Sequence, residues 1–345
     1  MELLWFCFLA FLLSGYVLLD GYDLGTGVLH LFVARTDAER RQTLRTINSV
    51  WHGNEVWLLA AGGALVLAFP VLYASSFSGF YLPLMMVLWL LIMRGVALHF
   101  RNDVPNALWG QFWDVCFAIA SALLALFFGV ALGNVLRGLP LDATGGFFLP
   151  LWHDFRVSQD AGVLDWYTTL VGALALLTLA EHGALWLACR TDGPVRERSM
   201  RIAKLLVPVV ASLVAIVTFC TLRVQPQVGS NLAARPWGYV LPLLAVGGLI
   251  AVMVALRAGQ VMRAFAANAL YVVGMLGSAA FGIYPYVLPA IDDPARGLTI
   301  DNTASSPHAL TVALFWFIPG MLLVIAYTVF AHRKFAGRVG AEDHA

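Results

Sequence analysis

Long apolar runs alternate with short polar segments along the whole chain. A helix needs about 20 mostly apolar residues to cross a hydrocarbon layer about 30 Å thick. Nine runs reach this length: 4–33, 53–73, 75–98, 112–136, 163–188, 203–222, 237–256, 264–289 and 309–331. The pattern therefore predicts an all-α integral membrane protein with nine transmembrane helices.

The composition excludes a water-soluble enzyme. Hydrophobic residues make up 60% of the 345 residues, charged residues make up 12%, and the mean hydropathy is +0.80. Soluble domains are about 45–50% apolar and about 25% charged, so one aqueous core cannot bury this much apolar surface. The formal net charge of +1 provides no basic field for binding nucleic acid.

Basic residues are unevenly divided between the two ends of the expected spans. Segments on one side carry fifteen of the 21 Lys and Arg residues, segments on the other side carry five, and Arg94 lies within a span. Because cytoplasmic loops are enriched in Lys and Arg, this count predicts an outside N-terminus and a cytoplasmic C-terminus.

The first span carries ionisable residues that the bilayer normally excludes. Asp20, Asp23 and His30 recur at helical spacing and share one face of the helix with Tyr16 and Gly27. A charge inside a span costs about 2.5–3.5 kcal/mol on insertion scales, so such residues often mark function. This face serves either as a polar packing seam or as a path for protons or water.

Other ionisable residues stand out in later spans. His52 and Glu55 lie one turn apart where the second span begins, either as part of an interfacial aromatic belt or as a proton entrance. Arg94 either extends toward the headgroups or pairs with Asp23 or an acidic cofactor group, whereas we expect Arg101 to be dispensable. The fifth span is interrupted by Glu181 and His182.

Few signatures of metal or covalent chemistry are present. The four cysteines are far apart and form no CxxC or Cys/His cluster, so we expect no metal site. Only His30 and His182 lie well inside spans, and they do not recur at the geometry of a haem-binding pair. The sequence contains no phosphate loop, nucleophile elbow or metalloprotease helix, which leaves hydrolases and nucleotide-driven enzymes without support.

Several long motifs resemble one family of membrane proteins. They are GYDLGTG (21–27), RTDAERR (35–41), WHGNEVWLL (51–59), AGGA (61–64), FSGFY (77–81), RGVA (94–97), GNVLRGLP (133–140) and YPYVLP (284–289). Together they resemble subunit II of the cytochrome bd-type quinol oxidases over nearly the whole chain.

The resemblance implies a function that spacing alone does not give. It implies a respiratory complex of the bacterial cytoplasmic membrane that oxidises quinol, reduces dioxygen to water and generates a proton gradient. Two b-type haems and one d-type haem are expected in the partner, subunit I. A structural quinone in this chain, small single-helix subunits and contacts with membrane lipid are further expectations, whereas nucleic acid is not an expected partner.

The resemblance also implies how the spans are grouped. We expect a first four-helix bundle over 1–136, an outer loop over 137–162 and a second four-helix bundle over 163–289. The remaining residues, 290–345, are expected to form an outer loop, a peripheral ninth helix and a cytoplasmic tail.

Individual residues match the family unevenly. Asp23 matches an acidic residue proposed to conduct protons in some members, and Trp57 matches a tryptophan near a suggested oxygen route or subunit interface. His52 departs from the pattern, because many members have Asp at this position. Two other classes stay open, a secondary transporter with a polar site at mid-membrane and a subunit that binds haem itself.

Small residues suggest where helices approach closely. The pairs Gly21/Gly25 and Gly62/Gly63, together with Gly79, form small-residue seams. We expect these seams to contact a second multi-span chain, and we expect this chain to be unstable without that partner.

Overall fold

The computed structural model describes residues 1–158, 160 and 162–340. These residues form mainly α-helices, with two 3₁₀ turns and one small antiparallel hairpin. The elements are α1 (Glu2–Val33), α2 (Asp37–Asn48), α3 (Trp51–Ala68), α4 (Pro70–Gly79), α5 (Tyr81–Phe100), α6 (Ala107–Arg137), α7 (Trp166–Arg190), α8 (Gly193–Val224), α9 (Pro226–Ala234), η1 (Pro236–Tyr239), α10 (Val240–Arg257), α11 (Val261–Ile283), β1 (Tyr286–Leu288), η2 (Pro294–Arg296), β2 (Leu298–Thr299) and α12 (Pro307–Lys334).

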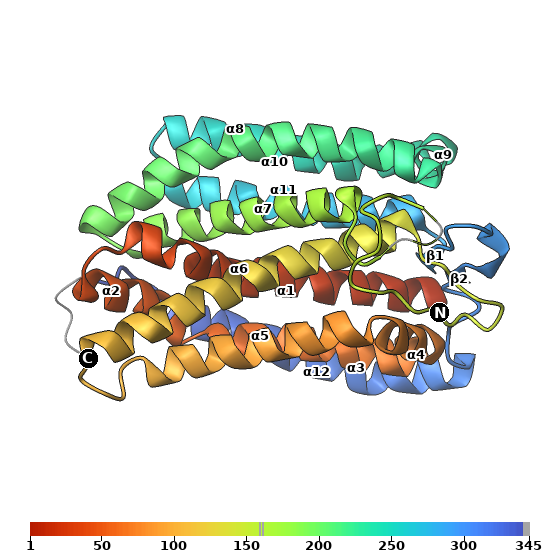
Figure 1. Ribbon diagram of the computed structural model, residues 1–345, viewed down its shortest axis with the longest axis horizontal. Helices are drawn as coiled ribbons and strands as arrows, with labels where there is room; N and C mark the ends of the chain where they lie inside the picture. Colours follow the sequence, from red (N-terminus) through yellow and green to blue (C-terminus); the bar gives the residue numbers. More distant parts are fainter. Residues whose placement is uncertain (159, 161, 341–345) are drawn as a thin grey trace.

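The long helices run side by side along the long axis of the molecule, and the two termini lie at opposite ends (Figure 1). Helix α1 is central, because it packs against α3 and α6 on one side and against α7 on the other. Helix α5 packs on α6, α8 packs on α7, and α10 packs on α11, while α12 lies against α3. The grouping into two four-helix bundles and a peripheral helix stays a prediction.

The chain has eight helices that are long and apolar enough to span a membrane, and nine spans if the bent pair α3 and α4 counts as one, among the described residues. The expected second span, 53–73, is wrong only after Ala68, because α3 ends there and α4 bends away by 119°. Phe69 has non-helical angles before Pro70, as the steric clash of a proline with its preceding residue requires. The expected third span therefore begins at Tyr81 rather than at 75.

Helices α1 and α7 approach so closely that their backbones touch. A Cβ atom on Gly25 would lie 1.9 Å from the carbonyl oxygen of Leu179, and one on Gly183 would lie 2.2 Å from the carbonyl carbon of Gly25. The expectation that Gly21/Gly25 contacts a second chain is thus wrong, because α7 of the same chain occupies that seam. Gly79 likewise packs against Phe147 within this chain.

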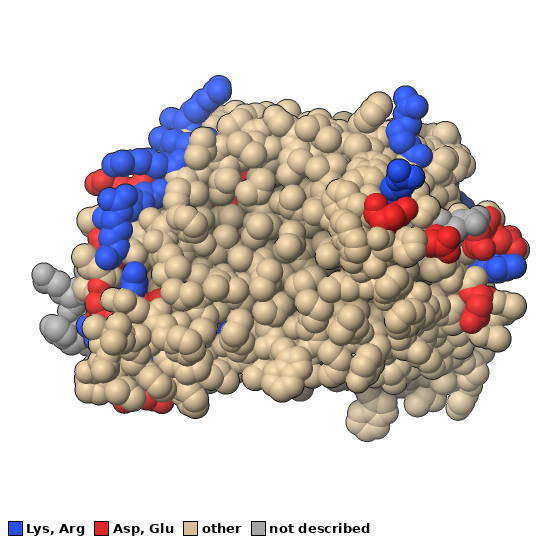
Figure 2. Space-filling model, viewed as in Figure 1, with Lys and Arg blue, Asp and Glu red and all other residues tan. Residues whose placement is uncertain are grey.

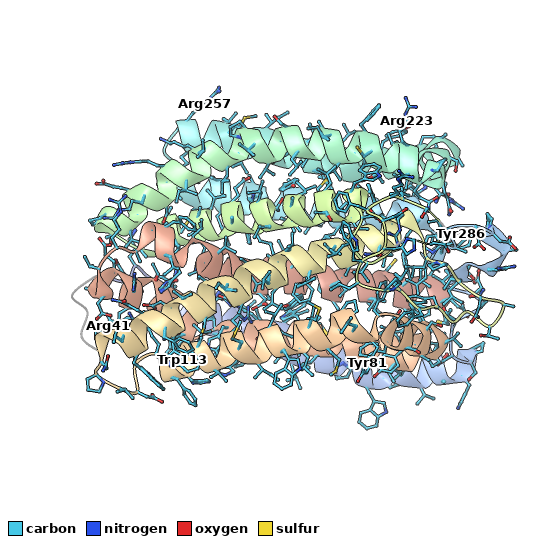
Figure 3. All side chains as sticks on the ribbon, viewed as in Figure 1. Arg41, Tyr81, Trp113, Arg223, Arg257 and Tyr286 are labelled. Carbon is cyan, nitrogen blue, oxygen red and sulfur yellow. The ribbon has the colours of Figure 1, made fainter. Side chains whose placement is uncertain are left out.

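Charged side chains gather at the two ends of the molecule and leave an apolar girdle between them (Figure 2). Arg41 and Arg257 lie at the end that holds the C-terminus, whereas Arg223 and Tyr286 lie at the opposite end (Figure 3). At that opposite end a buried ion pair joins Arg137 to Asp165, which also caps α7. The girdle is the surface that a lipid bilayer requires.

Candidate functional site

A buried ion pair links α1, α5 and α3. The Arg94 guanidinium donates to the Oδ2 atom of Asp20 at 2.9 Å and also contacts Glu55. The side chains of Arg94 and Asp20 are at most 1% exposed, whereas that of Glu55 is 27% exposed. The group therefore extends from the surface at Glu55 to a fully buried carboxylate at Asp20.

Asp23 does not pair with Arg94, so that expected partner is wrong. A helix turns about 100° per residue, which separates two positions three apart by about 60° around the axis. Asp20 consequently faces Arg94, while the Oδ2 atom of Asp23 accepts a hydrogen bond of 2.8 Å from the amide of Asn54 on α3. The Oδ1 atom of Asp23 has no hydrogen-bond partner among the residues that the structure describes.

The hydrogen bonds continue from Asp23 to α12. The Asn54 amide also donates to the Tyr22 hydroxyl at 2.8 Å, and that hydroxyl lies 2.7 Å from Nε2 of His332. Because Nδ1 of His332 lies 2.8 Å from the Thr328 carbonyl, it carries the proton in the neutral ring, and Nε2 accepts from Tyr22. Asn54, Tyr22 and His332 were not predicted as site residues, although Asn54 and Tyr22 lie inside the motifs that contain Glu55 and Asp23.

His52 lies apart from this group. Its ring stacks on Trp51 with centroids 3.6 Å apart and lies 5.5 Å from the ring of His99. It is exposed, and none of its described contacts reaches Glu55 or Asp23. Among the described residues, no side-chain contact therefore connects His52 to the buried carboxylates.

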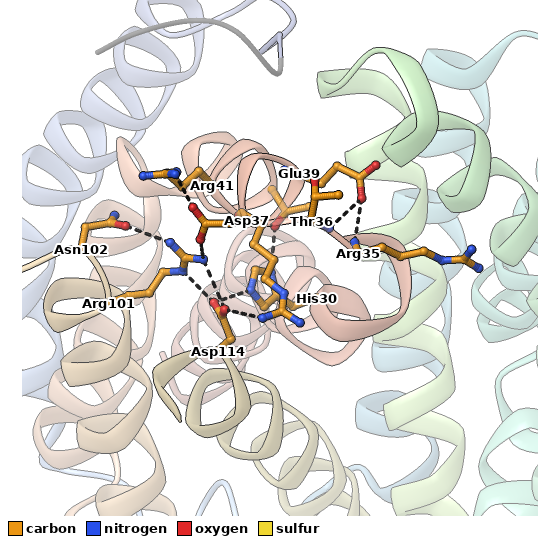
Figure 4. Close-up of polar contacts among 11 residues, drawn as sticks. His30, Arg35, Thr36, Asp37, Glu39, Arg41, Arg101, Asn102 and Asp114 are labelled. Atoms are coloured by element: carbon orange, nitrogen blue, oxygen red, sulfur yellow. Dashed lines mark hydrogen bonds and ion pairs between the residues drawn. The ribbon is translucent and has the colours of Figure 1, made fainter. Parts of the chain in front are cut away.

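His30 belongs to a second network, at the end where the C-terminus lies (Figure 4). Its ring is fully buried, with Nδ1 2.8 Å from Thr43 and Nε2 2.8 Å from Asp114. Asp114 also accepts from Arg101 at 2.7 Å and from Arg40 at 3.0 Å. His30 thus joins α1 to α2 and α6 and does not extend the Asp20–Asp23 face, contrary to the expected single path.

Arg101 is not the dispensable residue that we expected. It is 4% exposed and forms ion pairs with both Asp114 and Asp37. Burial alone lowers the pKa of Arg101, but the hydrogen bonds and charges of Asp114 and Asp37 outweigh burial and raise that pKa above its ordinary value. The guanidinium stays charged because two carboxylates face it.

A further ion pair holds α2 to α8. The Glu39 carboxylate accepts from Arg198 at 2.8 Å and from the backbone N–H groups of Arg35 and Thr36. Burial raises the pKa of Glu39, but these hydrogen bonds outweigh burial and hold that pKa below its ordinary value. The carboxylate is therefore kept ionised where the helix begins.

The remaining predicted site residues, Trp57, Glu181 and His182, are buried between helices of this chain. Trp57 is buried between α1 and α12, and its indole N–H donates to Thr328 at 3.3 Å. Glu181 and His182 are fully buried on α7, and both contact Asn268 of α11. This placement gives Trp57 an internal packing contact rather than an exposed face.

The two buried histidines, His30 and His182, and the partly buried His332 do not fit haem ligation. A haem iron needs a free ring nitrogen, and both ring nitrogens of His30, His182 and His332 contact protein atoms. Within the described part of the chain, no group of three or more His, Cys, Asp or Glu side chains could hold a metal ion. The chemistry that this arrangement offers is the binding and transfer of protons.

Comparisons with known proteins agree on one family. The family described as cytochrome bd terminal oxidase subunit II matches residues 1–335. The probable cytochrome oxidase subunit 2 of Haemophilus influenzae is 30% identical, over 99% of this chain and 96% of that protein. The cytochrome bd-I ubiquinol oxidase subunit 2 of Escherichia coli K12 is 28% identical over the same shares.

A third relative and a solved structure agree with these matches. The cytochrome bd ubiquinol oxidase subunit 2 of Bacillus subtilis is 28% identical, over 99% of this chain and 97% of that protein. A chain in the structure of the bd oxidase from Geobacillus thermodenitrificans has the same fold, with a TM-score of 0.75 and 19% identity. That likeness covers 97% of this chain and 98% of the other.

Proposed function

This chain belongs to the family of cytochrome bd terminal oxidase subunit II, and from that premise we propose that its buried carboxylates deliver protons for oxygen reduction. The chain is a multi-pass bacterial membrane protein and one subunit of a haem-containing quinol oxidase, an oxidoreductase. Subunit I is its partner, and quinol and dioxygen are the substrates of the complex.

The observation that carries the proposal is the line of carboxylates from Glu55 to Asp20 and Asp23. Glu55 is half-buried and reaches the surface, while Asp20 and Asp23 are 0% and 1% exposed. A buried carboxylate that lacks a full set of hydrogen bonds is costly to keep ionised. Because the Oδ1 atom of Asp23 lacks a partner among the described residues, this oxygen is the atom that takes up a proton.

Each residue of the group has a distinct role in this proposal. Glu55 receives protons from water at the end that holds the C-terminus, and Arg94 holds Glu55 and Asp20 in place by charge. Asp23 stores the proton before it passes to the partner, and Asn54 orients Asp23. His52 supplies an exposed, titratable ring beside the entrance.

The finer arrangement belongs to the same proposal. We place the C-terminal end in the cytoplasm, because Lys and Arg residues predominate there, and the whole complex in the cytoplasmic membrane. The haems are placed in subunit I, because the buried histidines of this chain lack a free ring nitrogen. The comparisons favour this oxidase subunit over the secondary transporter.

The partner docks, in this proposal, on the outer face of α3. Among the described residues, no atom lies within 4 Å of where a Cβ would stand on Gly62 or Gly63, and Leu59 and Val66 on the same face are exposed. This is the part of the expected small-residue seam that the chain itself leaves open. A close helix–helix contact with a second membrane protein suits such a face.

Replacing Asp23 with Asn tests the proposal. The amide keeps the shape and the hydrogen bond to Asn54 but cannot ionise. Positioned acid–base groups contribute about 10²–10⁴-fold to proton transfer, so we expect quinol-dependent oxygen consumption to fall at least about tenfold with intact haem spectra. His52→Ala should give a smaller loss with an altered pH dependence.

Asp301→Asn is the matched control, because Asp301 is an exposed carboxylate of a loop at the far end of the molecule. It should respire at the wild-type rate. If Asp23→Asn also respires at that rate from about pH 6 to about pH 8, which spans the range of unperturbed histidine titration, Asp23 is a packing residue and the proposed path is wrong.

A further inference from the structure

Three buried polar side chains meet where α1, α7 and α11 pack together. Glu181, His182 and Asn268 are each 0% exposed. The Asn268 side chain lies between the other two, with its NH₂ group 2.8 Å from Oε1 of Glu181 and its Oδ1 atom 2.7 Å from Nδ1 of His182. Nε2 of His182 lies 3.0 Å from the carbonyl oxygen of Leu18 on α1. One continuous line of hydrogen bonds thus connects the three helices.

The donor and acceptor roles of the atoms along this line restrict where the protons can be. A backbone carbonyl only accepts, so Nε2 of His182 carries a proton. If the ring is neutral, Nδ1 is an acceptor, and Asn268 must turn its NH₂ group toward it. The amide oxygen of Asn268 then faces Glu181, and two oxygens share a hydrogen bond only if Glu181 brings a proton.

The amide orientation drawn in the structure corresponds instead to an ion pair across the amide. If both ring nitrogens of His182 are protonated, Nδ1 donates to the amide oxygen, and the NH₂ group of Asn268 donates to an ionised Glu181. The oxygen and nitrogen of an amide side chain have nearly the same shape, so packing permits both orientations. In both states the three side chains hold one proton beyond that on Nε2.

The surroundings favour the neutral state. Oε2 of Glu181 has no hydrogen-bond partner among the described residues, and neither Glu181 nor His182 forms an ion pair in that part of the chain. Neighbouring groups are uncharged: the Thr178 and Tyr271 hydroxyls bond to each other, and Phe265 stacks on the His182 ring. An ionised carboxylate is strongly disfavoured where one of its oxygens has no hydrogen-bond partner and no charged group lies nearby.

We propose that Glu181 is a proton-binding site, occupied in the folded protein, in which the Asn268 amide is turned from its drawn orientation, so that the carboxylic acid donates to the Asn268 oxygen and the Asn268 NH₂ donates to neutral His182. This site is separate from the proposed path through Asp23, and the proposal does not depend on that path. Loss of the proton would set two oxygens against each other across 2.8 Å or force Asn268 to turn. The proton therefore completes the hydrogen bonds that join α7 to α11 and, through His182, α7 to α1.

Infrared difference spectroscopy of the purified oxidase complex tests this assignment. Comparison of wild type with Glu181→Gln should show loss of the carbonyl stretch of a protonated carboxylic acid, with the shift in D₂O that such a group undergoes. The matched control is Glu197→Gln, because the Glu197 side chain is 71% exposed, and it should remove only a carboxylate band. Loss of a carboxylate band in Glu181→Gln instead would overturn the proposal.

A second variant keeps the test decisive if Glu181→Gln does not assemble. Asn268→Leu keeps the approximate size of the side chain but removes the acceptor for the acid proton. The carboxylic-acid band of Glu181 should then move, because its hydrogen bond is gone, while haem bands of the complex stay in place. A band unchanged by Asn268→Leu would show that the acid does not donate to Asn268, and the proposal would be wrong.

Discussion

At the scale of single residues, the Arg94 side chain balances the charge of the buried carboxylates. It contacts Asp20 and Glu55, and its own side chain is 1% exposed. Removing one partner of a buried ion pair costs about 3–5 kcal/mol, because the other charge is left uncompensated. We expect Arg94→Leu to lower the yield and the thermal stability of the complex, as measured by haem content and unfolding temperature.

The control for Arg94→Leu has to replace an arginine that forms no buried ion pair. Arg257→Leu is suitable because Arg257 is exposed at the end of α10, whereas Arg101 is itself buried and paired. Arg257→Leu should leave yield and unfolding temperature nearly unchanged. Equal, mild effects from both variants would mean that Arg94 only neutralises headgroup charge and that Asp20 does not depend on it.

The cost of charge in a membrane made some of these residues predictable. It identified Asp20, Asp23, Glu55 and Arg94 as functional candidates from the sequence. The pairing was not predictable, because it depends on which side of α1 faces each neighbouring helix. Asn268 gave no signal at all, since an uncharged amide in an apolar run becomes informative only when α11 packs beside α7.

At the scale of elements, the short helix α2 depends on its ion pair with α8. Glu39 completes a capping box with Thr36 and binds Arg198. Because the pKa of Glu39 is lower in the folded chain than its ordinary value, its contribution to stability is fully present above that ordinary value, which is about 4.3 for glutamate. The contribution is lost as the pH falls through the lowered pKa of the folded state.

We therefore expect acid to weaken the attachment of α2 in the wild-type complex. The unfolding temperature should fall as the pH drops below about 4.3, and Glu39→Gln should show a smaller fall over the same range together with a lower value at neutral pH. Thermal unfolding followed at a series of pH values measures both. Identical pH profiles for the two proteins would contradict a stabilising role for the ionised carboxylate.

The open face of α3 gives a test of subunit assembly. A Cβ on Gly63 meets no atom of the described residues within 4 Å, so we expect a leucine there to disturb the contact with the partner rather than the packing of this chain. Overpacking a contact costs about 1–3 kcal/mol, or about five- to 150-fold in association. We expect Gly63→Leu to reduce co-purification with the haem-bearing subunit.

Gly247→Leu is the matched control for Gly63→Leu. Gly247 is also exposed on a membrane-spanning helix, α10, and also has open space around its Cβ position. Co-purification should be normal for this variant. A normal yield of complex from Gly63→Leu would place the interface with subunit I on another face.

Hydropathy predicted most helices well because span length is a physical requirement of the bilayer. It failed where two helices run together without a polar break, since apolar residues continue from α3 through α4 into α5. Pro70 indicated that the helix would break, but the angle between α3 and α4 depends on how the two helices pack and could not be predicted from the sequence. Hydropathy also failed at the end of the expected span 264–289, because α11 ends at Ile283 and residues 286–288 form strand β1. The β1–β2 hairpin pairs only two or three residues per strand, which is too short for a periodic signal.

At the scale of the whole molecule, the position of the carboxylates relative to the two ends sets the direction of proton movement. Glu55 and Arg94 lie in the halves of α3 and α5 nearest the end that holds Arg41 and the C-terminus, as the helix bounds place them. Helix α1 carries Asp20 and Asp23 and packs against both α3 and α7. The C-terminal end is thus where water would supply protons.

Proton uptake during a single turnover is the most direct test of the role of Asp23. The complex is reconstituted in vesicles, reduced, and mixed with oxygen, while a pH-sensitive dye reports uptake on the C-terminal side and absorbance reports the haems. In Asp23→Asn we expect the haems to bind oxygen at the wild-type rate and proton uptake to slow at least about tenfold. Uptake at the wild-type rate in this variant, with intact haems, would contradict proton delivery through this chain.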